Sequence, residues 1–171
     1  MKKNIKKISP ASFDDIKIIG INSSLVDFKL AWSINNKLSI NFVRYNDIFE
    51  NGAQYAFYYY DTGETGNTFN LVSLVYKGTY WQQTSPRIDF MLIIRNYIAP
   101  TKLNEMLKSI REIPGIGYAF IMDPLSDNSI GLLLETIELH EIDLLNEMQK
   151  RNNIKAVKEE IRKKKLNQPL Q

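Results

Sequence analysis

Apolar and polar positions recur along the chain with two different periods, and these periods predict the secondary structure. Residues 14–21 form a short apolar run that predicts a strand. Residues 23–38 carry apolar side chains at steps of three and four, which is typical of an amphipathic helix. Ser23 or Ser24 is expected to cap that helix, because a serine hydroxyl accepts hydrogen bonds from first-turn amides.

The middle of the chain shows the pattern of a sheet. Residues 53–78 predict a β-hairpin, because two aromatic and β-branched runs flank a loop rich in Gly, Asp, Asn and Thr. Residues 87–97 contain "FMLII", which is apolar at odd and even positions alike. Such a run is typical of a central strand that is covered on both faces.

A helix and a strand follow the central run. Thr101 is expected to cap the helix, and Pro114 with Gly115 to end it. The next strand ends before Pro124, and the strand–helix–strand unit 87–123 is a candidate for a parallel crossover. The inner face of the helix is predicted to comprise Leu103, Met106, Leu107 and Ile110.

The C-terminal part of the chain predicts helical structure with a break. Residues 129–135 fit a strand or a helix, whereas the pattern from Glu138 onward is helical. Asn152 and Asn153 predict an interruption before a second helical piece. The order of elements indicates an α+β fold: one two-layer domain, residues 8–135, has a mostly antiparallel sheet with helices on one face. Residues 136–171 are expected to form a basic helical extension.

Charge is distributed unevenly along the 171 residues. The net charge is +3, yet residues 1–7 carry +4 and residues 150–165 carry +6, so the segment between them carries −7. An acidic body with basic ends is unlike a nucleic-acid-binding domain, whose basic groups lie on the folded face. The basic start is not followed by a long apolar segment, and no run approaches the ~20 residues of a membrane span. We therefore expect a cytoplasmic protein without a signal peptide.

The sequence contains few residues of the types that commonly act as catalytic groups or metal ligands. The absence of cysteine excludes disulfides and thiolate metal sites. His140 is the single histidine, and neither a phosphate-binding glycine motif nor a serine nucleophile motif is present. We therefore expect no enzyme activity, no cofactor and no metal site. A deep polar pocket around Asp89 or Asp123 would instead favour an enzyme with a small-molecule substrate.

The stretch "GIGYAFIMD", residues 115–123, imitates the base-stacking strand of an RNA-recognition motif. That strand begins with a basic residue and ends with an aromatic one, whereas this stretch has Ile116 and Asp123 at those places. A core strand is the preferred interpretation, with Tyr118 and Phe120 packing under a helix or lining the sheet.

The basic tail and the tyrosine run "FYYY" are the candidate binding residues. The tail fits either a solvated amphipathic helix, whose lysines support solubility, or an arm that docks on an anionic partner. Its narrow apolar stripe must be buried on the body or on a partner. We expect a non-catalytic interaction protein that holds a protein partner or a larger complex; the alternative is an RNA- or ribonucleoprotein-associated protein that binds phosphate through the tail lysines. The oligomeric state stays open. The candidate binding residues are Ile154, Val157, Lys158, Ile161, Arg162, Lys163, Lys164, Lys165, Tyr58 and Tyr60.

Three segments, "VDFKLAWSINNKLSINFVR", "RIDFMLIIRNYI" and "IPGIGYAFIMDP", together resemble the uncharacterised bacterial IPExxxVDY family over about residues 14–124. Ile88, Asp89 and Phe90 stand where the family has Val-Asp-Tyr. The Ile-Pro-Glu triplet would fall on residues 82–84, which are Gln-Gln-Thr. The resemblance implies a small cytoplasmic bacterial protein and makes the tail beyond about residue 136 an addition; it brings no active site.

Overall fold

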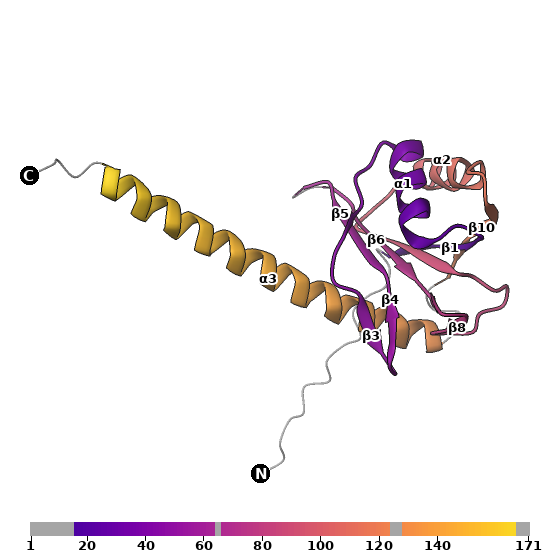
Figure 1. Ribbon diagram of the computed structural model, residues 1–171. Coiled ribbons are helices and arrows are strands. Elements are labelled where there is room, and N and C mark those ends of the chain that lie inside the picture. Colours follow the sequence, from indigo (N-terminus) through magenta and orange to yellow (C-terminus); the bar gives the residue numbers. More distant parts are fainter. Residues whose placement is uncertain (1–15, 64–65, 124–127, 167–171) are drawn as a thin grey trace, which may run out of the picture. The chain divides into compact units, whose positions relative to one another are not determined.

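The computed structural model describes residues 16–63, 66–123 and 128–166. The chain divides into two compact units, Met1–Gly131 and Leu132–Gln171. All the described strands belong to the first unit, whereas the described part of the second unit is helical (Figure 1). Each unit is considered by itself below.

The first unit is built on a six-stranded antiparallel sheet with the strand order β10-β1-β9-β6-β5-β2. Its strands are β1 (Lys17–Ser23), β2 (Val43–Arg44), β5 (Phe57–Asp61), β6 (Thr68–Ser73), β9 (Phe90–Arg95) and β10 (Ile116–Met122). Two short hairpins stand beside it. They pair β3 (Ile48–Glu50) with β4 (Ala53–Tyr55), and β7 (Val75–Tyr76) with β8 (Thr79–Tyr80).

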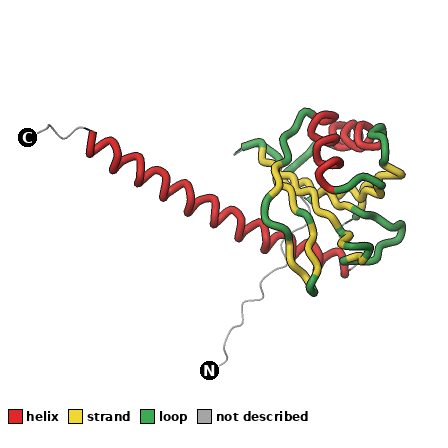
Figure 2. Tube along the Cα trace, viewed as in Figure 1, coloured by secondary structure: helices red, strands yellow, loops and turns green. Residues whose placement is uncertain are grey.

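Helices α1 (Asp27–Leu38) and α2 (Pro100–Arg111) lie next to each other over one face of this sheet (Figures 1 and 2). The predicted α+β class with a mostly antiparallel sheet is therefore confirmed. The predicted hairpin is also present, because β5 pairs with β6. Its expected first residues, Ala53–Tyr55, pair with β3 instead.

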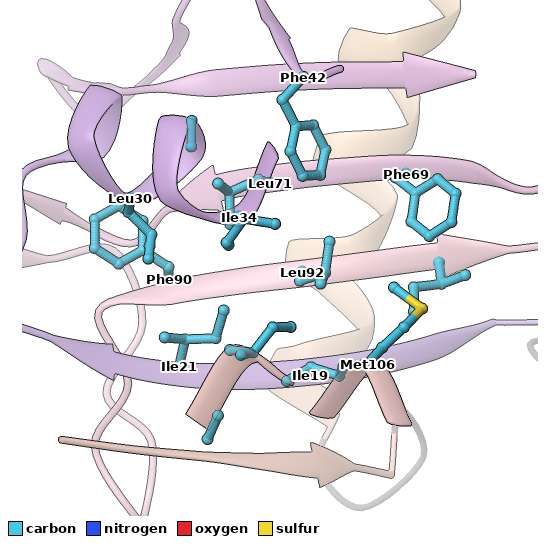
Figure 3. Close-up of a cluster of buried hydrophobic side chains, with 14 of the residues drawn as sticks. Ile19, Ile21, Leu30, Ile34, Phe42, Phe69, Leu71, Phe90, Leu92 and Met106 are labelled. Carbon is cyan, nitrogen blue, oxygen red and sulfur yellow. The ribbon is translucent and has the colours of Figure 1, made fainter. Parts of the chain in front are cut away.

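The hydrophobic core lies between the sheet and these two helices (Figure 3). Leu30 and Ile34 of α1 point at Leu71 and Leu92 of the sheet, while Met106 approaches from α2. The four predicted inner residues of α2 are all buried. Ile34 and Leu92 are fully buried. The apolar face of the helix and the facing side of the sheet therefore pack against each other in one apolar layer.

The second face of the sheet is buried as well. Ile18, Met91 and Ile93 point away from the α1–α2 layer, and each has no exposed surface. Strand β9 therefore buries side chains on both faces and has paired strands on both edges, β1 and β6. This arrangement confirms the interpretation of "FMLII" as a central strand.

The unit 87–123 forms a split crossover. Strands β9 and β10 both run antiparallel to β1, which lies between them, so they are parallel to each other. Helix α2 connects them across one face of the sheet. The predicted parallel crossover is thus present, with one strand inserted between its two arms.

Both predicted helix caps are wrong. Helix α1 begins at Asp27 after Val26, and α2 begins at Pro100 after Ala99; neither start has a side-chain cap. Ser23 is instead the last residue of β1, where its backbone N–H donates to a carboxylate far along the chain. In α2, proline occupies the first helical position, where its missing N–H costs no hydrogen bond.

Helix α3 (Asn128–Leu166) is continuous over 39 residues. The ambiguous residues 129–135 are therefore helical, and the break predicted at Asn152 and Asn153 is wrong. An asparagine inside a helix costs at most about 0.7 kcal/mol, which the surrounding Lys, Glu and Arg residues tolerate. None of the described helices is long and apolar enough to cross a membrane.

Candidate functional site

A cavity of about 400 Å³ opens at one end of the sheet in the first unit. Its wall comes from the end of β1 and the start of α1, from β2 and β4, from the end of β6 and the start of β9, and from β7. These segments meet because antiparallel pairing places the end of β1 beside the start of β9. The charged residues that line the cavity are Asp27, Arg44, Asp47, Lys77 and Asp89.

Asp89 is held by three donors. Its Oδ1 accepts a hydrogen bond of 2.6 Å from the Tyr80 hydroxyl. Its Oδ2 accepts one of 2.8 Å from Asn22 Nδ2 and one of 2.9 Å from the backbone N–H of Ser23. Burial, followed by the hydrogen bond to Asp89, raises the pKa of Tyr80 above its ordinary value, so this phenol remains a donor at neutral pH.

A second network is centred on Arg44. Its Nη1 donates to Asp27 Oδ2 at 2.7 Å, and its Nη2 donates to Asp47 Oδ1 at 2.9 Å. The Tyr58 hydroxyl donates to the same oxygen of Asp27 at 3.0 Å. Burial lowers the pKa of Arg44, but Asp47 and Asp27 outweigh it, so the net pKa is raised. The guanidinium thus forms ion pairs with two carboxylates of its own chain.

Tyr58 and Tyr60, which were candidate binding residues, belong to the core instead. Tyr58 is 5% exposed, and burial together with the charge of Asp27 raises its pKa to about 12. Tyr60 is half-buried and stacks on Phe69 with ring centroids 5.8 Å apart. Tyr58 therefore packs in the fold and offers no exposed aromatic surface, because the hairpin turns this side chain toward Asp27 of α1.

The tail candidates lie on the distal part of α3. Ile154 is 54% exposed and Val157 is 55% exposed. Lys158, Arg162 and Lys163 are exposed too, whereas the side chains of Ile161, Lys164 and Lys165 lie outside the described part of the chain. Every residue from 149 to 160 is exposed, so this length of helix is exposed on all its faces in the described structure.

The stretch that imitates an RNA-recognition strand forms β10, an edge strand rather than a central one. Ala119 is the residue that packs into the core between sheet and helices. Tyr118 and Phe120 point to the other face; Tyr118 is 38% exposed, and its hydroxyl donates to the backbone oxygen of Arg87. The two aromatic residues therefore line the sheet, as one form of the core interpretation expected, and do not pack under α1 or α2.

Sequence reasoning missed the Arg44 network entirely. Asp27 and Arg44 are 17 positions apart, and no local motif joins them. Asp89 had been named in the family resemblance and as a place where a deep polar pocket would favour an enzyme, and the cavity does reach it. Among the residues that the structure describes, no group of three or more His, Cys, Asp or Glu side chains could hold a metal ion.

Comparison with models of known families, with curated proteins and with solved structures finds no match for this chain.

Proposed function

We propose that this chain is a non-catalytic cytoplasmic protein that holds a partner protein through residues 149–163 of α3, here called the arm. The observation that carries the proposal is the complete exposure of residues 149–160, about three turns of helix. Helices in folded proteins gain most of their stability by packing an amphipathic face. A helix whose described residues are exposed on every face is suited to packing on another molecule.

The arm has the composition of a helix that docks in a groove. Ile154 and Val157 are three positions apart and therefore share one face. The arm contains six cationic side chains against Glu159 and Glu160, which is a net charge of +4. The partner that fits is a protein with an apolar groove whose rim is acidic. Such a groove would bury the apolar stripe of the arm, and the acidic rim would pair with its cationic side chains.

An apolar stripe favours protein over RNA as the partner. RNA binding needs only the lysines and arginines, and each neutralised phosphate adds about one unit to the log–log slope of affinity against salt. It would leave Ile154 and Val157 in water. Docking in a groove buries both side chains and depends less steeply on salt.

The test is capture of a partner from native lysate by the full chain and by single variants, with and without ribonuclease. Val157→Asp places a charge on the apolar stripe. Asn152→Asp places the same charge on the opposite side of the same exposed helix, so it is the matched control. Capture that survives ribonuclease, fails in Val157→Asp and persists in Asn152→Asp supports the proposal. Capture lost with ribonuclease, or equal in both variants, contradicts it.

We also propose that the chain is a divergent member of the IPExxxVDY family. Support comes from the residue at the centre of the retained half of the motif. Asp89 accepts three hydrogen bonds, from Tyr80, Asn22 and Ser23, and thereby joins β1 to the start of β9. A residue with this structural task would persist while residues 82–84, none of which is buried, change.

A further inference from the structure

The cavity at the end of the sheet has the size of a small-molecule site. Its volume of about 400 Å³ lies within the ~300–1,000 Å³ of ordinary ligand pockets. Leu25, Val26, Ala56, Val75 and Phe90 supply apolar wall, and the remaining lining residues, Asp89 among them, are polar or charged. Sites of this size hold a ligand by apolar contact and by polar groups that fix its orientation.

The charges on the wall favour a cation. Three carboxylates, Asp27, Asp47 and Asp89, face two cations, Arg44 and Lys77, which leaves a net charge of −1. The guanidinium of Arg44 already forms ion pairs with Asp27 and Asp47. The described residues give Asp89 only neutral hydrogen-bond donors, a phenol, an amide and a backbone N–H. Arg87 lies over the ring of Tyr80, with its guanidinium carbon 4.1 Å from the ring centre, but it does not line the cavity. Within the lining, no cation is therefore hydrogen-bonded to Asp89.

Other ligand classes fit this wall less well. An anion would face the negative charge of Asp89, and Lys77 is an exposed residue whose Nζ lies 5.1 Å from the centre of the Tyr76 ring. A bound metal ion needs several ligands around one point, and the described carboxylates do not converge in that way. An organic cation with an apolar body matches both the charge and the apolar wall.

We infer that this cavity binds a small organic ammonium ion, whose N–H groups donate to Asp89 and whose apolar part packs on Val75 and Phe90. A carboxylate offers about four acceptor positions, of which the three donors occupy three. These donors also hold the carboxylate in place, so little ordering is needed when the ligand arrives. The inference is independent of the arm, which lies in the other unit of the chain.

The first experiment titrates the full chain with phenethylammonium and, separately, with phenethyl alcohol, which has the same apolar body without the charge. Amide chemical shifts are followed by NMR. Phenethylammonium should give saturable shifts at Ser23, Val75 and Phe90 with a Kd on the order of 1 mM. The alcohol should bind at least about tenfold more weakly, since it lacks a charged partner for Asp89.

Two variants locate the site. Val75→Phe fills the cavity without changing a charge and should abolish the shifts. Asp89→Asn removes the charge and should weaken binding about tenfold or more. Glu105→Gln removes an exposed carboxylate on α2, outside the cavity, and should bind as the unaltered chain does. If Asp89→Asn fails to fold, the comparison of the two ligands still tests whether the positive charge of the ligand contributes to binding. Val75→Phe still tests whether the ligand binds in this cavity. Absence of saturable shifts, equal binding of the alcohol, or undiminished binding by Val75→Phe would overturn the inference.

Discussion

Asp89 Oδ2 accepts a hydrogen bond of 2.9 Å from the backbone N–H of Ser23, a residue 66 positions earlier in the chain. Ser23 is the last residue of β1, and Asp89 directly precedes β9. One carboxylate thus satisfies a backbone donor at the point where the chain leaves the sheet for α1. The same carboxylate forms part of the wall of the cavity.

Replacing Asp89 by alanine should lower the free energy of unfolding by about 2–4 kcal/mol. The change leaves the donors of Ser23, Asn22 and Tyr80 without their common acceptor, and each half-buried donor then loses a bond to a charged group. Urea denaturation followed by circular dichroism measures the change. Glu105→Gln serves as control and should stay within about 0.5 kcal/mol. An Asp89→Ala variant as stable as the control would show that the three hydrogen bonds do not stabilise the fold.

The stability of the fold should fall between about pH 10 and pH 12 because of Tyr58. Burial and the charge of Asp27 raise its pKa from 10.0 to about 12. Above pH 10 the unfolded chain loses this proton while the folded chain keeps it, so rising pH favours the unfolded state. The loss should reach about 2 kcal/mol at the upper end of that window.

Comparison with Tyr58→Phe isolates this contribution, because the variant has no phenol to titrate at that position. Urea denaturation at a series of pH values gives both stability curves. The difference between the two chains should be constant below pH 10 and should then shrink as the pH rises. A difference that does not change with pH would contradict the raised pKa.

Two isoleucine-to-alanine changes should differ widely in their cost. Ile34 has no exposed surface and packs between α1 and the sheet, so Ile34→Ala should cost about 2–5 kcal/mol. Ile154 is 54% exposed on the arm, and Ile154→Ala should change stability by less than about 0.5 kcal/mol. Thermal unfolding of both variants measures the contrast. A large loss in Ile154→Ala would mean that the arm is packed within its own chain, contrary to the proposed function.

Arg111 protects an exposed sheet edge. Its Nε donates to the backbone oxygen of Ala119 at 2.7 Å, in the middle of edge strand β10, which itself carries no charged residue. Uncharged edge strands pair readily with other chains. Arg111→Ala should therefore raise self-association, which light scattering against concentration detects. Lys102→Ala removes an exposed cation from the same helix and should scatter like the unaltered chain; equal scattering by both variants would contradict this role of Arg111.

Local patterns were sufficient for the elements whose signals lie between near neighbours. The apolar stripe of α2, the hairpin of β5 and β6, and the two-sided burial of β9 all follow from spacings within one segment. The break at Asn152 could not be judged in this way, because a helix continues or ends on the summed preferences of many residues. The prediction of the helix cap at Ser23 was wrong for a related reason. A serine next to a helical pattern can instead belong to a strand, as Ser23 does.

The sequence by itself determined the α+β class, the central strand and the basic, amphipathic character of the arm, since period and charge are properties of neighbouring residues. Only the tertiary structure decided that Tyr58 is buried, that "GIGYAFIMD" is an edge strand and that a cavity exists at all. The cavity requires Ser23, Arg44 and Asp89 to meet from three separate strands or strand ends. Whether residues from different strands come together depends on which strands pair and in which register. Pairing and register are determined by burial of the whole core rather than by any one segment.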